Sequence, residues 1–176
     1  MNFSKTKSLV AAALVGALAC GALLAQFKNT PQEQKNEDMV LNMYREVLQY
    51  HHYDLSSKYM VDDYIQHNPN DPPGRQGLMD MLKERFPNPE PLQPEMKNKP
   101  VLVISQGDIV LQMTEGKAKD PADPSKMYTF NHFEMVRVAN GIAQEHWDDA
   151  KLTPEGQERM EKHTSSAQFP PFVPAK

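Results

Sequence analysis

The spacing of apolar residues divides the chain into two parts. Over residues 31–50, apolar side chains recur every three or four positions, which predicts an amphipathic helix, and residues 76–86 repeat this pattern up to a proline. Between these segments, residues 54–59 predict a short helix capped by Asp54, and residues 64–67 predict a short extended segment. The first part of the chain is therefore expected to be mainly helical.

From residue 101 onward, the apolar residues follow a spacing typical of strands. Residues 101–105 and 108–113 predict one hairpin, and residues 127–138 and 142–148 predict a second hairpin around an Asn-Gly turn. Helices followed by strands predict an α+β domain over residues 31–150. We expect one curved antiparallel sheet with the helices on one of its faces.

Three further segments connect or extend these elements. Residues 87–100 contain five prolines, which predicts a stiff surface connection. Residues 114–126 are polar and contain glycine and proline, which predicts a loop. Residues 151–176 form a C-terminal tail that begins with a possible helix and ends in "FPPFVPAK", a stretch suited either to pack on a partner subunit or to stay loose.

The N-terminal residues 1–25 have the pattern of a signal peptide. Two lysines precede an uncharged, mainly apolar run of 17 residues, 9–25. That run is short for a membrane span, which usually takes about 20 residues, but an uncleaved membrane anchor is the alternative. The sequence Ala17-Leu18-Ala19 before Cys20 also permits lipidation of that cysteine. We therefore expect export to the periplasm or medium, or else a lipoprotein anchored through Cys20, with membrane contact only through this segment.

Charge and cysteine content narrow the possible partners. With 19 basic and 23 acidic residues, the chain has no basic field for nucleic acid, so no nucleic-acid partner is expected. Cys20 is the only cysteine, so the domain must be stabilised by its core and not by disulfides.

The connection of the second hairpin decides which side chains share a face of the sheet. A two-residue turn places Glu134 opposite Trp147, whereas a three-residue loop places it opposite His146. One residue of register moves every side chain to the other face. The apolar pattern favours the three-residue loop, which gathers on one face Phe130, His132, Glu134, Val136, Val138, Ile142, Gln144, His146 and Asp148. This face is expected to be the floor of a pocket, and the other face an outer or subunit-contact surface.

The sequence resembles the SnoaL-like polyketide cyclases, which belong to the nuclear-transport-factor-two-like superfamily. The resemblance rests on "YIQHNP" followed by "GRQGL", and then on the hairpin "FEMVRVANGIAQEHWD". It implies a cone-shaped fold in which a curved sheet wraps around N-terminal helices and encloses a pocket. It also implies that Asp148 occupies the place of the aspartate that acts as acid and base in an intramolecular aldol reaction. Glu134 stands where the family has a histidine, and residues 114–126 look longer than the family's turn.

Four residues are candidates for catalysis. Asp148 at a partly apolar pocket mouth is poorly solvated and suited to take and return a proton, although a surface pair with Lys151 is the alternative. Glu134 and His146 can form a carboxylate–imidazole pair, or a buried ion pair that only fixes the register. His67 joins them if Ile65 points into the core, because alternate residues of a strand share a face; otherwise it supports the proline turn.

Four further residues are candidates for substrate binding: Tyr64, His132, Phe130 and Gln144. No cofactor is expected. A metal could use His132 with Glu134, or His146 with Asp148, but no cysteine or HxH signature supports one, so no metal is expected. The sequence thus predicts an exported acid–base enzyme of cyclase, isomerase or hydrolase type that acts on a small apolar or carbonyl-bearing molecule. The alternative is a non-catalytic small-molecule-binding or dimerisation module, and a homodimer is expected in either case.

Overall fold

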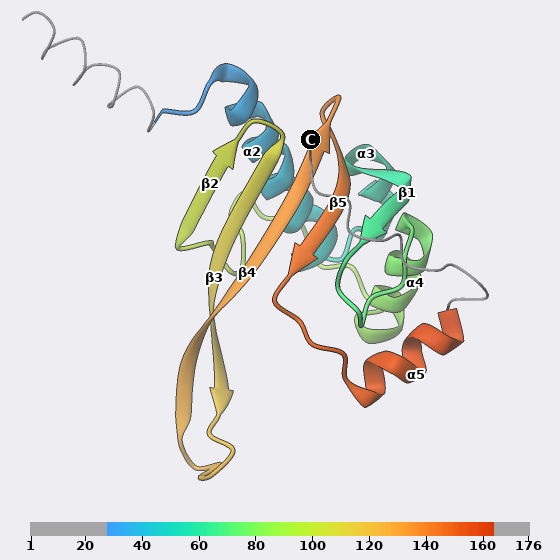
Figure 1. Ribbon diagram of the computed structural model, residues 1–176, viewed down its shortest axis with the longest axis vertical. Coiled ribbons are helices and arrows are strands. Elements are labelled where there is room, and N and C mark those ends of the chain that lie inside the picture. The colour runs from blue at the N-terminus through green and yellow to red at the C-terminus, as the bar shows by residue number, and fades with distance from the viewer. Residues whose placement is uncertain (1–27, 164–176) are drawn as a thin grey trace, which may run out of the picture.

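The computed structural model describes residues 28–163 and has helices first and strands second, as predicted (Figure 1). The helical elements are α2 (Pro31–Met43), a π-helical turn (Tyr44–Gln49), a 3₁₀ turn (Tyr53–Leu55), α3 (Ser56–Tyr59), α4 (Arg75–Arg85) and α5 (Pro154–His163). The strands are β1 (Met60–Gln66), β2 (Leu102–Gln106), β3 (Ile109–Lys119), β4 (Met127–Ala139) and β5 (Ile142–Asp148). The α+β class and both predicted hairpins are confirmed.

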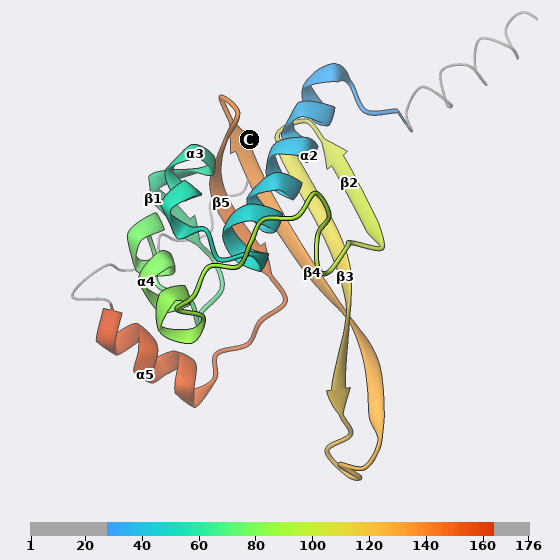
Figure 2. The ribbon, with the colours of Figure 1, turned by 180° about the vertical axis from the view of Figure 1, so that it is seen from behind.

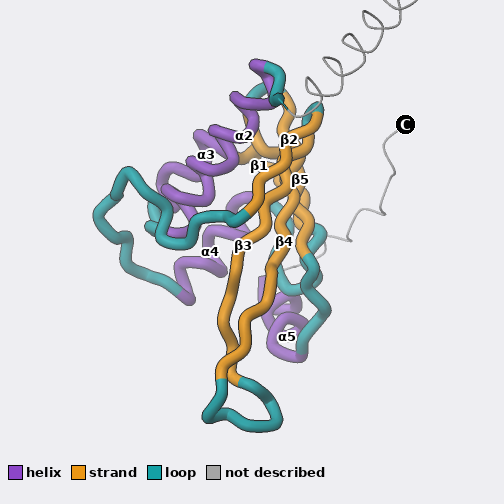
Figure 3. Tube along the Cα trace, turned by 90° about the vertical axis from the view of Figure 1, so that its left-hand side faces the viewer, coloured by secondary structure: helices purple, strands orange, loops and turns teal. Residues whose placement is uncertain are grey.

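The described strands form one open five-stranded sheet in the order β1-β5-β4-β3-β2. Helices α2, α3 and α4 lie on one side of it (Figures 2 and 3). Four of the strands are antiparallel neighbours, but β1 pairs with β5 in parallel. The expectation of a purely antiparallel sheet is therefore wrong at this edge, because β1 reaches the sheet from the helical half of the chain.

The register between β4 and β5 differs from the predicted one, although the faces come out nearly as expected. Ala139 pairs with Ile142, so the turn has two residues and the three-residue loop is wrong. A bulge then shifts the register, and Glu134 pairs with Asp148 instead of His146. A bulge and a three-residue loop each change the pairing by one residue, which explains why the predicted face survives beyond the bulge.

Strands β3 and β4 continue past the body of the sheet as a long two-stranded arm (Figure 1). Pairing runs out to Lys119 and Met127, so most of the segment predicted as a loop, residues 114–126, is strand. Only residues 120–126 make the turn at its tip. Alternating β-forming residues in β4 lengthen the hairpin because each has a partner in β3.

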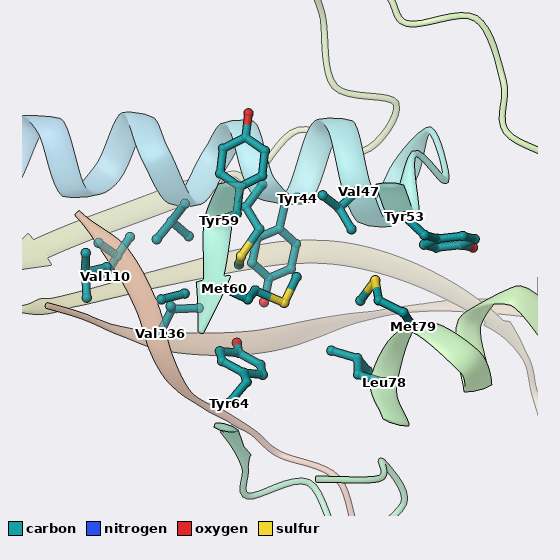
Figure 4. Packing of buried hydrophobic residues seen from close by; sticks show 14 of the residues in the cluster. Tyr44, Val47, Tyr53, Tyr59, Met60, Tyr64, Leu78, Met79, Val110 and Val136 are labelled. Carbon is teal, nitrogen blue, oxygen red and sulfur yellow. The ribbon is translucent and has the colours of Figure 1, made fainter. Parts of the chain in front are cut away.

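The core lies between the sheet and the helices (Figure 4). Val40 of α2 and Val47 of the π-helical turn are fully buried and belong to one core cluster with Val110 and Val136 from the sheet. Helix α2 begins with a capping box at Thr30. The prediction that Asp54 caps the short second helix is wrong, since no side chain caps either turn there.

Several sequence predictions concern residues beyond this region. The signal peptide, the run 9–25, Cys20 and the end of the C-terminal tail all lie outside the described residues. Among residues 28–163, no helix combines the length and apolar character needed to cross a bilayer. The start of the tail is described, and it forms helix α5 as predicted.

Candidate active site

A cavity of about 300 Å³ lies between the sheet and the helices. Its polar lining consists of Tyr44, Tyr64, Gln66, Asn68, Asp71, Arg85, His132, Glu134, His146 and Asp148. The rest of its wall is mainly aliphatic, with Met43, Leu48, Met60, Leu78, Met81 and Leu82. The volume is at the lower end of the range for small-molecule sites, about 300–1,000 Å³. The structure therefore brings ionisable groups from β1, β4 and β5 to one sheltered space.

His146 lies at the centre of this group and is 7 % exposed. Its Nδ1 atom lies 2.7 Å from Oε1 of Gln66, the residue paired with it on β1. Because an amide oxygen only accepts, Nδ1 carries the proton and Nε2 carries the lone pair. Nε2 is buried and has no hydrogen-bond partner among the described residues. Burial lowers the pKa of His146, which favours the neutral, basic imidazole.

Each carboxylate oxygen of Glu134 accepts a hydrogen bond. Oε1 accepts from Nε2 of His132 at 3.1 Å, and Oε2 accepts from Nε2 of Gln112 at 3.1 Å. Burial alone would raise the pKa of Glu134, but the hydrogen bond from His132 and nearby positive charge lower it overall. His132 is also paired with Asp149 at 2.7 Å, and the Glu134 hydrogen bond raises the pKa of His132 to about 9. This pair is thus an imidazolium and a carboxylate near neutral pH.

The predicted pairing of Glu134 with His146 is replaced by a different arrangement. Gln66, and not Glu134, orients the His146 ring. Glu134 remains close enough for its negative charge to act on His146. It can therefore stabilise a protonated His146 without fixing its tautomer.

Asp148 is held by groups from outside its own strand. Oδ2 accepts from Nδ2 of Asn68 at 2.6 Å, and Oδ1 accepts from the backbone N–H of Ala150 at 3.1 Å. No ion pair with Lys151 is present among the described residues, so that alternative is not supported. Each carboxylate oxygen keeps a further lone pair, since it can accept more than one hydrogen bond.

Asp71 is a third carboxylate in the cavity wall, beside Glu134 and Asp148, and was not predicted. Burial, with the negative charge of Asp148 as the next cause, raises the pKa of Asp71 to about 6. The charges of Arg159 and Arg85 act in the opposite direction. The pKa of Asp71 is thus raised, whereas that of Glu134 in the same cavity is lowered, and such a pair is a common basis for acid–base chemistry.

Two phenols complete the polar wall. Tyr64 is 2 % exposed, and its hydroxyl has no hydrogen-bond partner among the described residues. Burial and the nearby charge of Glu134 hold the pKa of Tyr64 far above its usual value, so it remains a donor. Tyr44, at the start of the π-helical turn, has its hydroxyl beside Glu134 and Gln112. Figure 4 shows the hydroxyl ends of Tyr44 and Tyr64 turned toward each other.

His67 lies on the opposite face of the sheet, so the expectation that it points into the cavity is wrong. In β1, Tyr64 and Gln66 are buried, and the alternate positions face outward. The His67 ring stacks on Trp147 at 4.5 Å between ring centres, and Nε2 lies 3.1 Å from Glu145. Trp147 was predicted on this outer face, and that placement is confirmed.

Two of the predicted substrate-binding residues also lie elsewhere. Phe130 is 41 % exposed on the β3–β4 arm, where its ring lies across Gly116. Gln144 stands at the bulge and donates to the backbone oxygen of Ile142 at 3.0 Å. The other two predicted binding residues, Tyr64 and His132, do line the cavity.

The sequence did not indicate three amides and one acid of this region: Gln66, Asn68, Gln112 and Asp71. Gln66 could have been found from the alternation in "YIQH" if Tyr64, and not Ile65, had been placed inward. Asn68 precedes Pro69, a sequence typical of a turn, and its side-chain oxygen accepts from the backbone N–H of Asn70 at 2.8 Å. Its amide also reaches Asp148, which no local pattern indicates.

The acids and histidines do not assemble into a metal site in the region that the structure describes. No group of three His, Cys, Asp or Glu side chains there has a suitable arrangement. The polar groups of the cavity are instead paired with amides and with each other.

Comparisons with known proteins give the fold. No protein-family model matches the sequence, and no curated protein matches it. Among solved structures, a candidate SnoaL-like polyketide cyclase from Jannaschia sp. CCS1 is 19% identical with a TM-score of 0.50, covering 69% of this chain and 90% of that chain. A candidate polyketide cyclase from Acidithiobacillus ferrooxidans is 17% identical (TM-score 0.48; 74% and 96%). An epoxide hydrolase from M. tuberculosis is 14% identical (TM-score 0.48; 76% and 94%). The chain thus has the SnoaL-like, nuclear-transport-factor-two-like fold.

Proposed function

We propose that this protein is an exported enzyme that moves protons on a small apolar or carbonyl-bearing molecule, without a cofactor, as a cyclase, isomerase or hydrolase. The observation that supports this most strongly is the Nε2 atom of His146, a buried basic nitrogen with no partner among the described residues. Fold alone assigns no reaction, so the proposal rests on this site.

Different side chains of the cavity act in different steps of the proposed proton transfer. Nε2 of His146 takes a proton from the carbon next to a substrate carbonyl. The negative charges of Glu134 and Asp148 favour the imidazolium that forms. Tyr64 donates its O–H to the carbonyl oxygen as that oxygen gains charge, and Asp148 offers free lone pairs to relay the proton onward.

The cavity wall sets the kind of molecule that fits. Its aliphatic residues, which include four from the helices, suit an apolar body, and the hydroxyl of Tyr64 suits one polar oxygen. At about 300 Å³ the space fits a small molecule in preference to a large one.

Deuterium exchange into small cyclic ketones tests this function directly. The purified protein is incubated in D₂O with a set of five- to ten-carbon cyclic ketones such as cyclohexanone, and exchange beside the carbonyl is followed by NMR. We expect exchange above the buffer rate, and a loss of about 10²- to 10⁴-fold in Asp148→Asn and in Tyr64→Phe. Asp63→Asn is the matched control, because Asp63 is exposed on β1.

A different result would favour the alternative function. If a ketone shifts resonances of cavity residues but exchanges no faster than in buffer, the protein is a small-molecule-binding module and the catalytic proposal is wrong. Equal exchange in Asp148→Asn and wild type would contradict the assigned site. Export and a homodimer stay predictions from the sequence.

A further inference from the structure

Helix α5 lies beyond the domain expected from the sequence, yet it is attached to the loop that serves the cavity. The side chain of Asn70 donates to the backbone oxygen of Lys151 at 2.9 Å and accepts from the N–H of Thr153 at 2.9 Å. Arg159 donates to the backbone oxygen of Asn70 at 3.0 Å. At the far end of the helix, Lys162 pairs with Glu84 of α4 at 2.7 Å. Figure 1 shows α5 beneath α4.

Gly156 makes this attachment possible. It is buried against Asn70, and a Cβ atom at this position would overlap the Asn70 side chain. Glycine inside a helix lowers helix stability by about 0.5–1 kcal/mol relative to alanine. The glycine therefore serves the contact with Asn70 and not the formation of the helix.

A continuous set of hydrogen bonds leads from this contact to the cavity. Oδ1 of Asn68 accepts from the backbone N–H of Asn70 at 2.8 Å and from its side chain at 3.1 Å. The amide of Asn68 is thereby oriented, and its Nδ2 donates to Asp148 at 2.6 Å. Asn68 is only 8 % exposed, so it has little freedom to turn elsewhere.

We propose that α5 is a functional part of the site: Asn70, Gly156 and Arg159 are positioning residues that hold Asn68 on Asp148. The catalytic consequence of this positioning rests on the proposed function, whereas the positioning itself does not. Asp71 follows Asn70 directly, so we expect the contacts that dock the helix also to limit solvent access to this carboxyl group.

The pKa of Asp71 is expected to depend on α5 in two opposite ways. The charged groups that act on it are Asp148 of β5, Glu134 of β4, Arg85 of α4 and Arg159 of α5. Burial is the largest cause of its raised pKa, and Arg159 opposes that shift. Releasing α5 should therefore lower the pKa of Asp71, whereas removing only the Arg159 charge should raise it.

The test uses NMR on the full chain and needs no substrate. Aspartate carboxyl groups are titrated through ¹³C labels, and hydrogen exchange of the Asn68 side-chain amide is measured. In Gly156→Val we expect the pKa of Asp71 to fall from about 6 toward the ordinary 3.8, and the Asn68 amide to lose protection. In Arg159→Gln, which removes the hydrogen bond to Asn70, we expect the Asn68 amide to lose protection, and Arg159→Lys, which keeps a donor and the charge, should restore it.

Gln157→Val is the matched control, because it places the same side chain on the exposed side of α5. It should leave both signals unchanged. In Gly156→Val, faster hydrogen exchange of the Thr153 backbone amide would show that its contact with Asn70 is lost. The proposal is wrong if this occurs while the Asn68 amide keeps its protection and the pKa of Asp71 stays as in wild type. It is equally wrong if Arg159→Gln, which removes the hydrogen bond to Asn70, leaves the protection of the Asn68 amide unchanged.

The catalytic consequence is measured separately by ketone exchange. Loss of positioning in Gly156→Val should slow exchange by about 100-fold with a smaller change in KM, since displacing a catalytic group by about 1 Å has this effect. Absence of exchange in the wild type would contradict the proposed function and leave the NMR result to decide the role of α5.

Discussion

Each face of the sheet carries a histidine with a glutamate nearby, but the two histidines have different surroundings. On the inner face, His146 is buried, oriented by Gln66, and keeps an unpartnered nitrogen. On the outer face, His67 stacks on Trp147 and pairs with Glu145. His146 lies on β5, and His67 directly follows β1, the edge strand that pairs with β5; both histidines have a glutamate within reach.

This difference shows what distinguishes a reactive group from a structural one. On the outer face, Nε2 of His67 contacts Glu145 and the ring packs on Trp147 at a partly exposed site. On the inner face, the unpartnered nitrogen of His146 is buried away from water. Residue type does not decide the role; the burial of an unpartnered nitrogen inside a cavity does.

The largest expected contrast between the faces is catalytic. His146→Gln should lower ketone exchange by about 10²- to 10⁴-fold, because the buried, unpartnered basic nitrogen of the cavity is lost. His67→Gln makes the same chemical change on the outer face and should leave exchange within about twofold, the ordinary scatter of such a change. A comparable loss in both variants would mean that the faces are not functionally distinct.

A smaller contrast is expected in stability. Glu134→Ala leaves Gln112 and the His132 imidazolium without their acceptor, which should cost about 2–3 kcal/mol of unfolding free energy. Glu145→Ala removes partners of Arg137 and His67 nearer to solvent and should cost about 0–1 kcal/mol. Urea denaturation at pH 7 measures both values, and equal losses would contradict the comparison.

The smallest expected effect is a pH dependence from His132. Its pKa is raised from 6.5 to about 9 in the folded state, so its contribution to stability is complete below pH 6.5 and is lost as the pH rises through 9. His132→Gln should remove this decline, worth less than about 1 kcal/mol because the ring is partly exposed. Thermal unfolding from pH 5 to 10 tests it, and an unchanged slope above pH 6.5 would argue against the imidazolium.

The sequence indicated much of the fold and part of the site. The period of the apolar residues gave the α+β class, both hairpins and the inner placement of Glu134, His146 and Asp148. The turn length was wrong, yet the bulge at Gln144 restored the same parity. A bulge depends on packing of two strands, so the hairpin sequence alone does not reveal it.

The missed features depend on contacts between distant segments. His67 was placed inward because Ile65 was taken as core, whereas pairing of β1 with β5 buries Tyr64 and Gln66. Asp71 lies in a proline-rich turn with no periodicity, so no local pattern indicates that it lines the cavity with Glu134 and Asp148. Phe130 left the predicted site because β4 extends into the arm.

The protonation state of His146 is the most direct test of the account. Nitrogen-detected NMR of ¹⁵N-histidine should show the neutral Nδ1–H tautomer at pH 7, with a bare Nε2 and a pKa below the ordinary 6.5. Replacing Gln66 by leucine should weaken this preference while leaving the fold intact. An Nε2–H tautomer, or an imidazolium that persists above pH 7, would contradict a basic nitrogen in the cavity.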